Sequence, residues 1–337
     1  MEKKNILVTG GNGFIGSHIV NNFVDRGYKV FVLCRRETSH NNQFMQNLQE
    51  GKIEIIQGDI KTIDYNNNFP DINYIVHVAG LVSAYGKMEH FMDINYEGTK
   101  RLLEYSKTLK NLKCFSYISS TAVYGYYGYT NLSEDAEKKP FDNPYSISKL
   151  KTEELVESFC KENKINYTIL RPGNVYGEYD YTSSHEIYSR VKRCKMSICA
   201  GGNKQSCFVY AGNLAEAIVH TTLNNKCYNT DYNITDGNNE TLREYLTKVA
   251  NTFGVKPRFI NFPAPIAKCV ATLVEGFYKF LDINEAPLIT KFSVWQNCAD
   301  YSFSIDKLLS TGYKKKFEED EAIQRTVDWF NSLENKQ

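Results

Sequence analysis

The chain has 337 residues, of which 42% are hydrophobic and 23% are charged, as in an ordinary soluble globular protein. Its formal net charge of +1 at pH 7 excludes the broad basic field on which nucleic-acid binding depends. The only cysteine cluster, Cys194, Cys199 and Cys207, matches no zinc-binding pattern, so we expect reduced thiols in a cytoplasmic protein and no metal site.

Neither a signal peptide nor a membrane span is expected. The apolar run in the opening MEKKNILVTG is too short for a secretory signal. The most apolar late segment, residues 263–281, is interrupted by Lys268, Glu275 and Lys279 and indicates an amphipathic helix. Such a helix packs on its own domain, covers an apolar substrate as a lid, or touches a membrane surface.

Short apolar runs alternate with polar, helix-like stretches in the first half of the chain. The runs are residues 5–8, 29–33, 53–57, 74–78, 114–118 and 167–170. This alternation predicts an α/β fold, a Rossmann-type doubly wound parallel sheet. After residue 172 the segments shorten, so we expect a dinucleotide-binding domain over 1–172 and a smaller C-terminal α+β substrate-binding domain over 173–337. Residues 205–225 are expected to return to the first domain.

The opening ILVTGGNGFIGSHIV is the most specific local signal. A strand leads into Gly10, Gly13 and Gly16, and a helix follows. Glycines allow a tight turn and a close approach of backbone to a pyrophosphate, which the helix N-terminus then binds. The alternative, a purely structural turn, lacks support from this strand–turn–helix context.

Two arginines, Arg35 and Arg36, follow the second predicted strand, where NAD-selective enzymes often place a carboxylate. Guanidinium groups suit a 2′-phosphate, so NADP(H) is favoured over NAD(H), with a solvated basic turn as the alternative. Asp59, after the third strand, either accepts a hydrogen bond from an adenine amino group or caps a helix.

Tyr145 and Lys149 lie four residues apart at the start of a predicted helix, so they share one helix face. Two other Tyr-x-x-x-Lys pairs exist, and position separates this one from them, because it follows the fifth strand and Ser120 by one loop. A phenol near an ammonium has a lowered pKa and can exchange a proton with a carbonyl or hydroxyl. Ser120 would hold that oxygen, and Asn95 is either a support residue or an ordinary helix residue.

The segments TGGNGFIG, SSTAVYG, YSISK and LRPGNVYG together resemble the extended short-chain dehydrogenase/reductase superfamily, the NAD-dependent epimerase/dehydratase family. The resemblance implies Ser120, Tyr145 and Lys149 as catalytic residues. With the residues above, it predicts a cofactor site formed by Gly10, Gly13, Phe14, Ile15, Gly16, Arg35, Arg36, Asp59, Ile60, Val78, Ala79, Gly80, Asn95, Tyr145, Lys149 and Pro172.

Further segments, among them HVAGLVSAYG and DYSFSIDKLLSTGYKKK, resemble the 3β-hydroxysteroid dehydrogenase-like branch. The sugar-nucleotide enzymes commonly carry an Arg-Asp pair where this chain has Gln205-Ser206-Cys207. The substrate half is rich in residues suited to an apolar pocket, namely Phe259, Phe262, Phe277, Tyr278 and Phe280. We therefore expect an NADP(H)-dependent oxidoreductase that interconverts a secondary alcohol and a ketone. Its expected substrate is a small molecule with a bulky, apolar body.

Two other functions stay open at this stage. One is a nucleotide-sugar epimerase or dehydratase, which shares the same motifs. The other is a cofactor-binding regulator without chemistry, against which the complete Ser120, Tyr145 and Lys149 set argues. The substrate, the direction of reaction and the oligomeric state are undetermined, although the resemblance admits a homodimer.

Overall fold

The computed structural model describes residues 4–65 and 69–334. A seven-stranded sheet forms its centre, and each strand runs parallel to its neighbours in the order β3-β2-β1-β4-β5-β7-β12. The strands are β1 (Asn5–Thr9), β2 (Lys29–Cys34), β3 (Ile53–Gln57), β4 (Tyr74–His77), β5 (Cys114–Ile118), β7 (Tyr167–Pro172) and β12 (Thr230–Ile234). The predicted Rossmann-type fold is confirmed, and β12 is a strand that the sequence pattern did not indicate.

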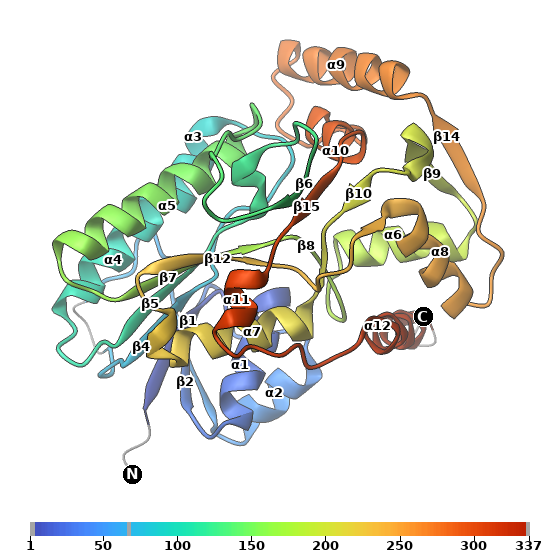
Figure 1. Ribbon diagram of the computed structural model, residues 1–337. Coiled ribbons are helices and arrows are strands. Elements are labelled where there is room, and N and C mark those ends of the chain that lie inside the picture. Colours follow the sequence, from blue (N-terminus) through green and yellow to red (C-terminus); the bar gives the residue numbers. More distant parts are fainter. Residues whose placement is uncertain (1–3, 66–68, 335–337) are drawn as a thin grey trace.

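Helices cover both faces of this sheet (Figure 1). Side chains alternate along each strand, so Ile6 and Val8 pack on one face and Leu7 on the other. The first face is covered by α1 (Phe14–Asp25), α2 (Asn42–Gln49) and α7 (Ala211–Leu223), and the second by α4 (Gly98–Thr108) and α5 (Pro144–Glu162). Two short helices, α3 (Met88–Phe91) and the π-helix η1 (Met92–Glu97), lead into α4.

The C-terminal half has a second apolar core, formed mainly by α6 (Ser183–Lys192), α8 (Leu242–Thr252) and α12 (Glu319–Glu334). Its other helices are α9 (Ala264–Phe280), α10 (Lys291–Asn297) and α11 (Asp306–Ser310). Paired short strands are β6 (Tyr129–Leu132) with β15 (Tyr301–Phe303), β8 (Asn174–Tyr176) with β11 (Phe208–Tyr210), β9 (Met196–Cys199) with β14 (Phe259–Phe262), and β10 (Gln205–Ser206) with β13 (Glu240–Thr241). The single-turn helices are η2 (Thr121–Tyr124), η3 (Ala200–Gly202) and η4 (Asn225–Cys227).

Later segments of the chain return to the central sheet. Helix α7 packs against α1, and β12 forms the edge of the sheet beside β7. A division of the chain near residue 172 therefore stays a prediction. Within the described ranges no helix is long and apolar enough to cross a membrane.

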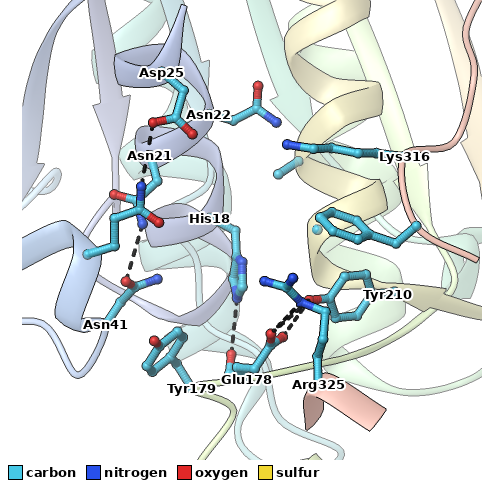
Figure 2. A pocket seen from close by; sticks show the side chains of 14 residues that line it. His18, Asn21, Asn22, Asp25, Asn41, Glu178, Tyr179, Tyr210, Lys316 and Arg325 are labelled. Carbon is cyan, nitrogen blue, oxygen red and sulfur yellow. Dashed lines mark hydrogen bonds and ion pairs between the residues drawn. The ribbon is translucent and has the colours of Figure 1, made fainter. Parts of the chain in front are cut away.

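A polar cavity of about 160 Å³ lies between α1, α7 and α12 (Figure 2). A ring nitrogen of His18 lies 3.1 Å from the carbonyl oxygen of Glu178, and burial lowers the pKa of this histidine. The Glu178 carboxylate accepts hydrogen bonds from the Tyr210 hydroxyl at 2.7 Å and from Arg325 Nε at 3.1 Å. These contacts connect the C-terminal helix α12 to α1. The residues that line the cavity include none of the predicted catalytic residues.

A buried guanidinium joins the sheet to α5. Arg171, on β7, has no exposed surface, and its Nε and Nη2 donate to the two carboxylate oxygens of Glu153 on α5, both at 2.9 Å. Its Nη1 donates to the Tyr124 hydroxyl at 2.6 Å, and Nη2 also contacts Asp231 on β12. Four elements, η2, α5, β7 and β12, are thus fixed through one side chain.

We expect Arg171→Met to lower the free energy of unfolding by about 3–5 kcal/mol, because the buried Glu153 loses its bidentate partner and keeps only Lys138, at 3.2 Å. Urea unfolding followed by circular dichroism measures the change. The double variant Arg171→Met/Glu153→Leu should recover much of the loss. Lys161→Met is the control, because it breaks the exposed Lys161–Glu157 pair on the same helix and should cost less than about 1 kcal/mol. Equal losses in the single and double variants would contradict the prediction.

Candidate active site

The glycine-rich turn after β1 is held by close backbone packing. Gly10 has a φ of +66°, and a Cβ placed there would lie 3.1 Å from the Cα of Ala79. A Cβ on Gly16 would lie only 2.2 Å from the carbonyl oxygen of Gly10. By contrast, a Cβ on Gly13 would meet only that oxygen, at 3.4 Å, so the surface above Gly13 is open.

The open surface lies at the N-terminus of α1. Gly13 is the N-cap residue and supplies no side-chain hydrogen bond to the helix. The first backbone N–H groups, those of Phe14 and Ile15, have no acceptor within the helix, and the helix dipole favours negative charge there. These residues fit a dinucleotide pyrophosphate.

The residues predicted to contact the adenosine half lie at the ends of β2 and β3. Both Arg35 and Arg36 are exposed, and Asn12 Nδ2 donates to the Arg36 carbonyl oxygen at 2.8 Å. Asp59 Oδ1 accepts from the backbone N–H of Lys61 at 2.9 Å, so this carboxylate caps the local turn. Its second predicted role, as an acceptor for adenine, stays a prediction.

Packing fixes the segments beside this site. Ile60 is buried, and a Cβ on Gly98 would lie 2.8 Å from its Cδ1 atom, so α4 and the turn after β3 meet closely. Pro172 ends β7, and the following Gly173 N–H donates to the Ile234 carbonyl oxygen at 3.0 Å.

At the end of β4, His77 has a structural position. Its two ring nitrogens lie 2.7 Å and 2.8 Å from the hydroxyls of Thr9 and Thr99. Burial, assisted by the nearby Lys149 charge, lowers the pKa of His77 to about 3. The Thr9 hydroxyl also accepts from the Ala79 N–H at 3.1 Å, so the neutral histidine sets the path of the 78–80 segment.

The structure brings Ser120, Tyr145 and Lys149 together. Ser120 follows β5; its hydroxyl accepts from the Ala122 N–H at 3.1 Å and faces the Tyr145 side chain. Helix α5 begins beside it because Asn143 Oδ1 accepts from the Tyr145 N–H at 2.9 Å and Pro144 occupies the first helical position. Lys149, on the same face of α5, donates to the carbonyl oxygen of Ile118, the last residue of β5, at 2.8 Å.

Electrostatics in this site differ from the expectation of a lowered tyrosine pKa. Burial raises the pKa of Tyr145, and the hydrogen bond with Ser120 opposes the shift only in part. Burial also lowers the pKa of Lys149 to about 8, opposed by Glu153. The ammonium is directed to a backbone carbonyl, so in the structure as described it does not favour the phenolate.

Asn95 supports helix α5 from the π-helix η1, a type of element frequent at functional sites. Its Oδ1 accepts from the Leu81 N–H at 2.6 Å, and its Nδ2 donates to the Ser148 hydroxyl at 3.0 Å. Ser148 in turn donates to the Tyr145 carbonyl oxygen at 2.9 Å. A Cβ on Gly80 would lie 3.1 Å from Asn95 Oδ1, so a glycine is needed for this close approach.

Sequence reasoning missed two contributors to the site. Phe292, on α10, packs edge-on against the Tyr145 ring, with a centroid distance of 6.3 Å. Arg171 anchors α5 through Glu153, as described above. Both contacts join residues far apart in the chain, and no local pattern marks them.

Comparison with known proteins places the chain in a family. The profile of the NAD dependent epimerase/dehydratase family matches residues 6–235, more than half of the chain, and the chain belongs to this family. The protein is an NAD(P)-dependent enzyme, and its predicted place in the extended short-chain dehydrogenase/reductase superfamily is confirmed. The hydroxysteroid dehydrogenase-like branch receives no specific support.

Several relatives match over nearly the full length. The chain is 29% identical to a Methanocaldococcus jannaschii protein provisionally named UDP-glucose 4-epimerase, over 97% of this chain and 98% of the relative. Its fold is similar to UDP-N-acetylglucosamine 4-epimerase from Methanobrevibacter ruminantium in complex with UDP-N-acetylmuramic acid (TM-score 0.79, 23% identity, 99% and 100% coverage). It is also similar to UDP-glucuronic acid 4-epimerase from Bacillus cereus in complex with NAD (TM-score 0.79, 21% identity, 99% and 98% coverage).

These relatives overturn the predicted reaction on a bulky apolar alcohol or ketone, and the predicted apolar substrate is wrong as well. The structure explains part of the error. Phe262, Phe277 and Phe280, counted as suited to an apolar pocket, are 43%, 59% and 85% exposed. Aromatic composition does not distinguish a pocket from an outer surface.

The lowered pKa of Lys149 gives a testable dependence of stability on pH. Between pH 8 and 10.5 the unfolded chain binds more protons at this lysine than the folded chain. The free energy of unfolding of the wild type should therefore rise with pH across this window, relative to that of Lys149→Met. Below pH 8 the folded chain carries the full cost of burying a charged lysine. Urea unfolding at several pH values measures the difference, with the exposed Lys151→Met on the same helix as control. Parallel pH profiles for wild type and Lys149→Met would refute the assignment.

Proposed function

We propose that the protein is a nucleotide-sugar epimerase or dehydratase. The observation that supports this most is the Ser120, Tyr145 and Lys149 cluster beside an open glycine turn, in a chain that aligns over nearly its full length with a relative provisionally named UDP-glucose 4-epimerase. A reducing compartment such as the cytoplasm is part of the proposal, because all nine cysteines are free.

Each side chain has a defined task in such a reaction. The residues around Gly10, Gly13 and Gly16 would hold a nicotinamide dinucleotide, which would supply reversible hydride transfer at a sugar carbon. Tyr145 takes the proton of the sugar hydroxyl at its phenolic oxygen and later gives it back. Ser120 donates a hydrogen bond to the same sugar oxygen, and Lys149 would hold the nicotinamide ribose. Asn95 keeps Tyr145 in position through Ser148.

The substrate half departs from the expected diphosphate-binding pattern. Ser206 and Cys207 are buried, and the Cys207 carbonyl oxygen accepts from the Asn174 N–H at 2.7 Å. Lys204, the nearest cation in the sequence, pairs with Asp300 at 2.8 Å. No side chain of the Gln205-Ser206-Cys207 segment carries a charge for a diphosphate, so the nucleotide as well as the sugar must be varied in a test.

The decisive experiment is turnover of a panel of UDP- and dTDP-linked hexoses with each nicotinamide cofactor, with products separated by ion-exchange chromatography. We expect an epimer or a 4-keto-6-deoxy product from at least one member. Tyr145→Phe should lower kcat by about 10²–10⁴-fold, because it removes the proton-transfer group. Tyr96→Phe is the matched control, since Tyr96 has the same spacing to a lysine but lies on η1. A protein that binds dinucleotide and turns over no panel member would refute the proposed function.

For the cofactor, the proposal favours NADP(H) over NAD(H). The supporting feature is the exposed Arg35-Arg36 pair, for which the described residues provide no carboxylate partner. The Bacillus cereus neighbour is in complex with NAD, which favours the opposite choice. Only NADP(H) carries a 2′-phosphate, so only this cofactor would gain charge-assisted hydrogen bonds from the two arginines.

Replacing Arg35 by alanine tests this choice directly. We expect the Kd for NADP⁺ to rise about tenfold or more, through loss of a charge-assisted hydrogen bond, and the Kd for NAD⁺ to change little. Isothermal titration calorimetry measures both constants. Arg258→Ala, at an exposed arginine outside the predicted cofactor site, is the control. Tighter binding of NAD⁺ by the wild type, with equal effects of Arg35→Ala on both cofactors, would show that the pair is only a solvated turn.

A further inference from the structure

Helix α9 has an unusual distribution of side chains. Its inner face carries Ala267, Ala271 and Glu275, all buried. Its outer face carries large apolar residues, among them Leu273, 68% exposed, and Phe277, 59% exposed. A helix that packs on its own domain has the reverse arrangement, with large apolar residues inside.

The inward position of Glu275 explains this orientation. Its Oε1 accepts from the Lys291 N–H at the first residue of α10, where the helix dipole favours a carboxylate. The alanines let α9 approach α10 closely, and Val294 of α10 packs against them. The contact of α9 with α10 is thus formed by small side chains and one carboxylate.

Helix α9 lies at an extremity of the molecule, with α10 on its inner side (Figure 1). Its exposed apolar side chains recur three or four residues apart, which places them on one face. We define the α9 patch as Ile266, Val270, Leu273, Phe277, Phe280, Leu281, Leu288 and Ile289, which are between 39% and 92% exposed. An outward helix face that carries several large apolar side chains marks a site of interaction.

Charge around the patch is positive. Residues 256–291 contain five Lys or Arg and three Asp or Glu, a net charge of +2, against +1 for the whole chain. Among the three carboxylates, Glu275 is buried at α10, Asp282 pairs with Lys87 at 2.8 Å, and Glu285 is exposed. Between Ala264 and Phe280, all of which the structure describes, no acidic side chain is exposed, whereas Lys279 is.

From this geometry we propose that the α9 patch docks the protein on a lipid bilayer that contains anionic headgroups. An amphipathic helix with an apolar outer face and flanking cations lies in the interface of such a bilayer. A second copy is the weaker occupant, because a two-fold contact would bring the two positive patches together. Side chains as exposed as Phe280, at 85%, and Leu288, at 92%, project outward and suit insertion.

Docking would also place the active site close to the bilayer. Tyr278, on α9, packs edge-on against Tyr85 at a centroid distance of 6.3 Å. In the same loop, the Ala84 carbonyl oxygen accepts from Asn143 Nδ2 at 2.6 Å, and Asn143 caps the N-terminus of α5. The surface proposed to bind lipid is therefore joined to the segment that precedes Tyr145.

The test is flotation of the full chain with vesicles of equal parts phosphatidylcholine and phosphatidylglycerol, compared with phosphatidylcholine alone. We expect the wild type to float with the anionic vesicles and less with the neutral ones. Leu273→Ser and Phe277→Ser should each lower the partition coefficient about tenfold, because an apolar side chain no longer enters the interface. Lys279→Gln should lower it about fivefold on anionic vesicles only.

Leu309→Ser is the matched control, because Leu309 is 47% exposed on α11, outside the α9 patch, and should bind vesicles as the wild type does. Dinucleotide binding checks that each variant is folded. Failure of the wild type to bind either vesicle, or equal binding by the α9 variants, would overturn the proposal. Sedimentation velocity tests the alternative, a contact between two copies of the chain. A dimer that Leu273→Ser converts to a monomer, without an effect on flotation, would show such a contact and overturn the proposal of lipid docking.

Discussion

One buried ion pair holds helix α5, which carries Tyr145 and Lys149, to the sheet. Arg171 on β7 binds Glu153, which lies one helical turn after Lys149 on α5, and it also binds Tyr124 in the turn that begins at Ser120. A guanidinium without exposed surface is tolerated only where its donors are satisfied, so this pairing fixes the rotation of α5 against β7. The relative positions of the phenol, the ammonium and the serine hydroxyl depend on it.

The same burial that fixes these groups also sets their resting charge. Removal from water raises the pKa of Tyr145 and lowers that of Lys149, so both shifts favour the neutral forms. Proton abstraction by a phenolate needs the opposite change. The fold by itself therefore only positions the Tyr145 and Lys149 side chains. The change in pKa that proton abstraction requires has to come from the charge of a ligand bound beside the glycine turn.

Much of this site could be predicted because its signals are local. The strands are apolar runs between turns, Gly16 sits where a Cβ would collide with backbone, and Gly10 has a positive φ. Tyr145 was identified by its place after the fifth strand, which the parallel sheet brings to the edge where ligands bind. The amide pairing of Asn95 and the contact of Phe292 with the tyrosine ring could not be predicted, because they depend on a π-helix and on a segment about 150 residues away.

Helix α9 shows why the substrate class was harder to predict than the fold. The sequence periodicity indicates two faces but not which of them turns inward. A carboxylate and small side chains turn inward here, because α10 offers a helix N-terminus to Glu275 and close packing requires alanine. The large apolar residues are left outside, so they say nothing about the substrate.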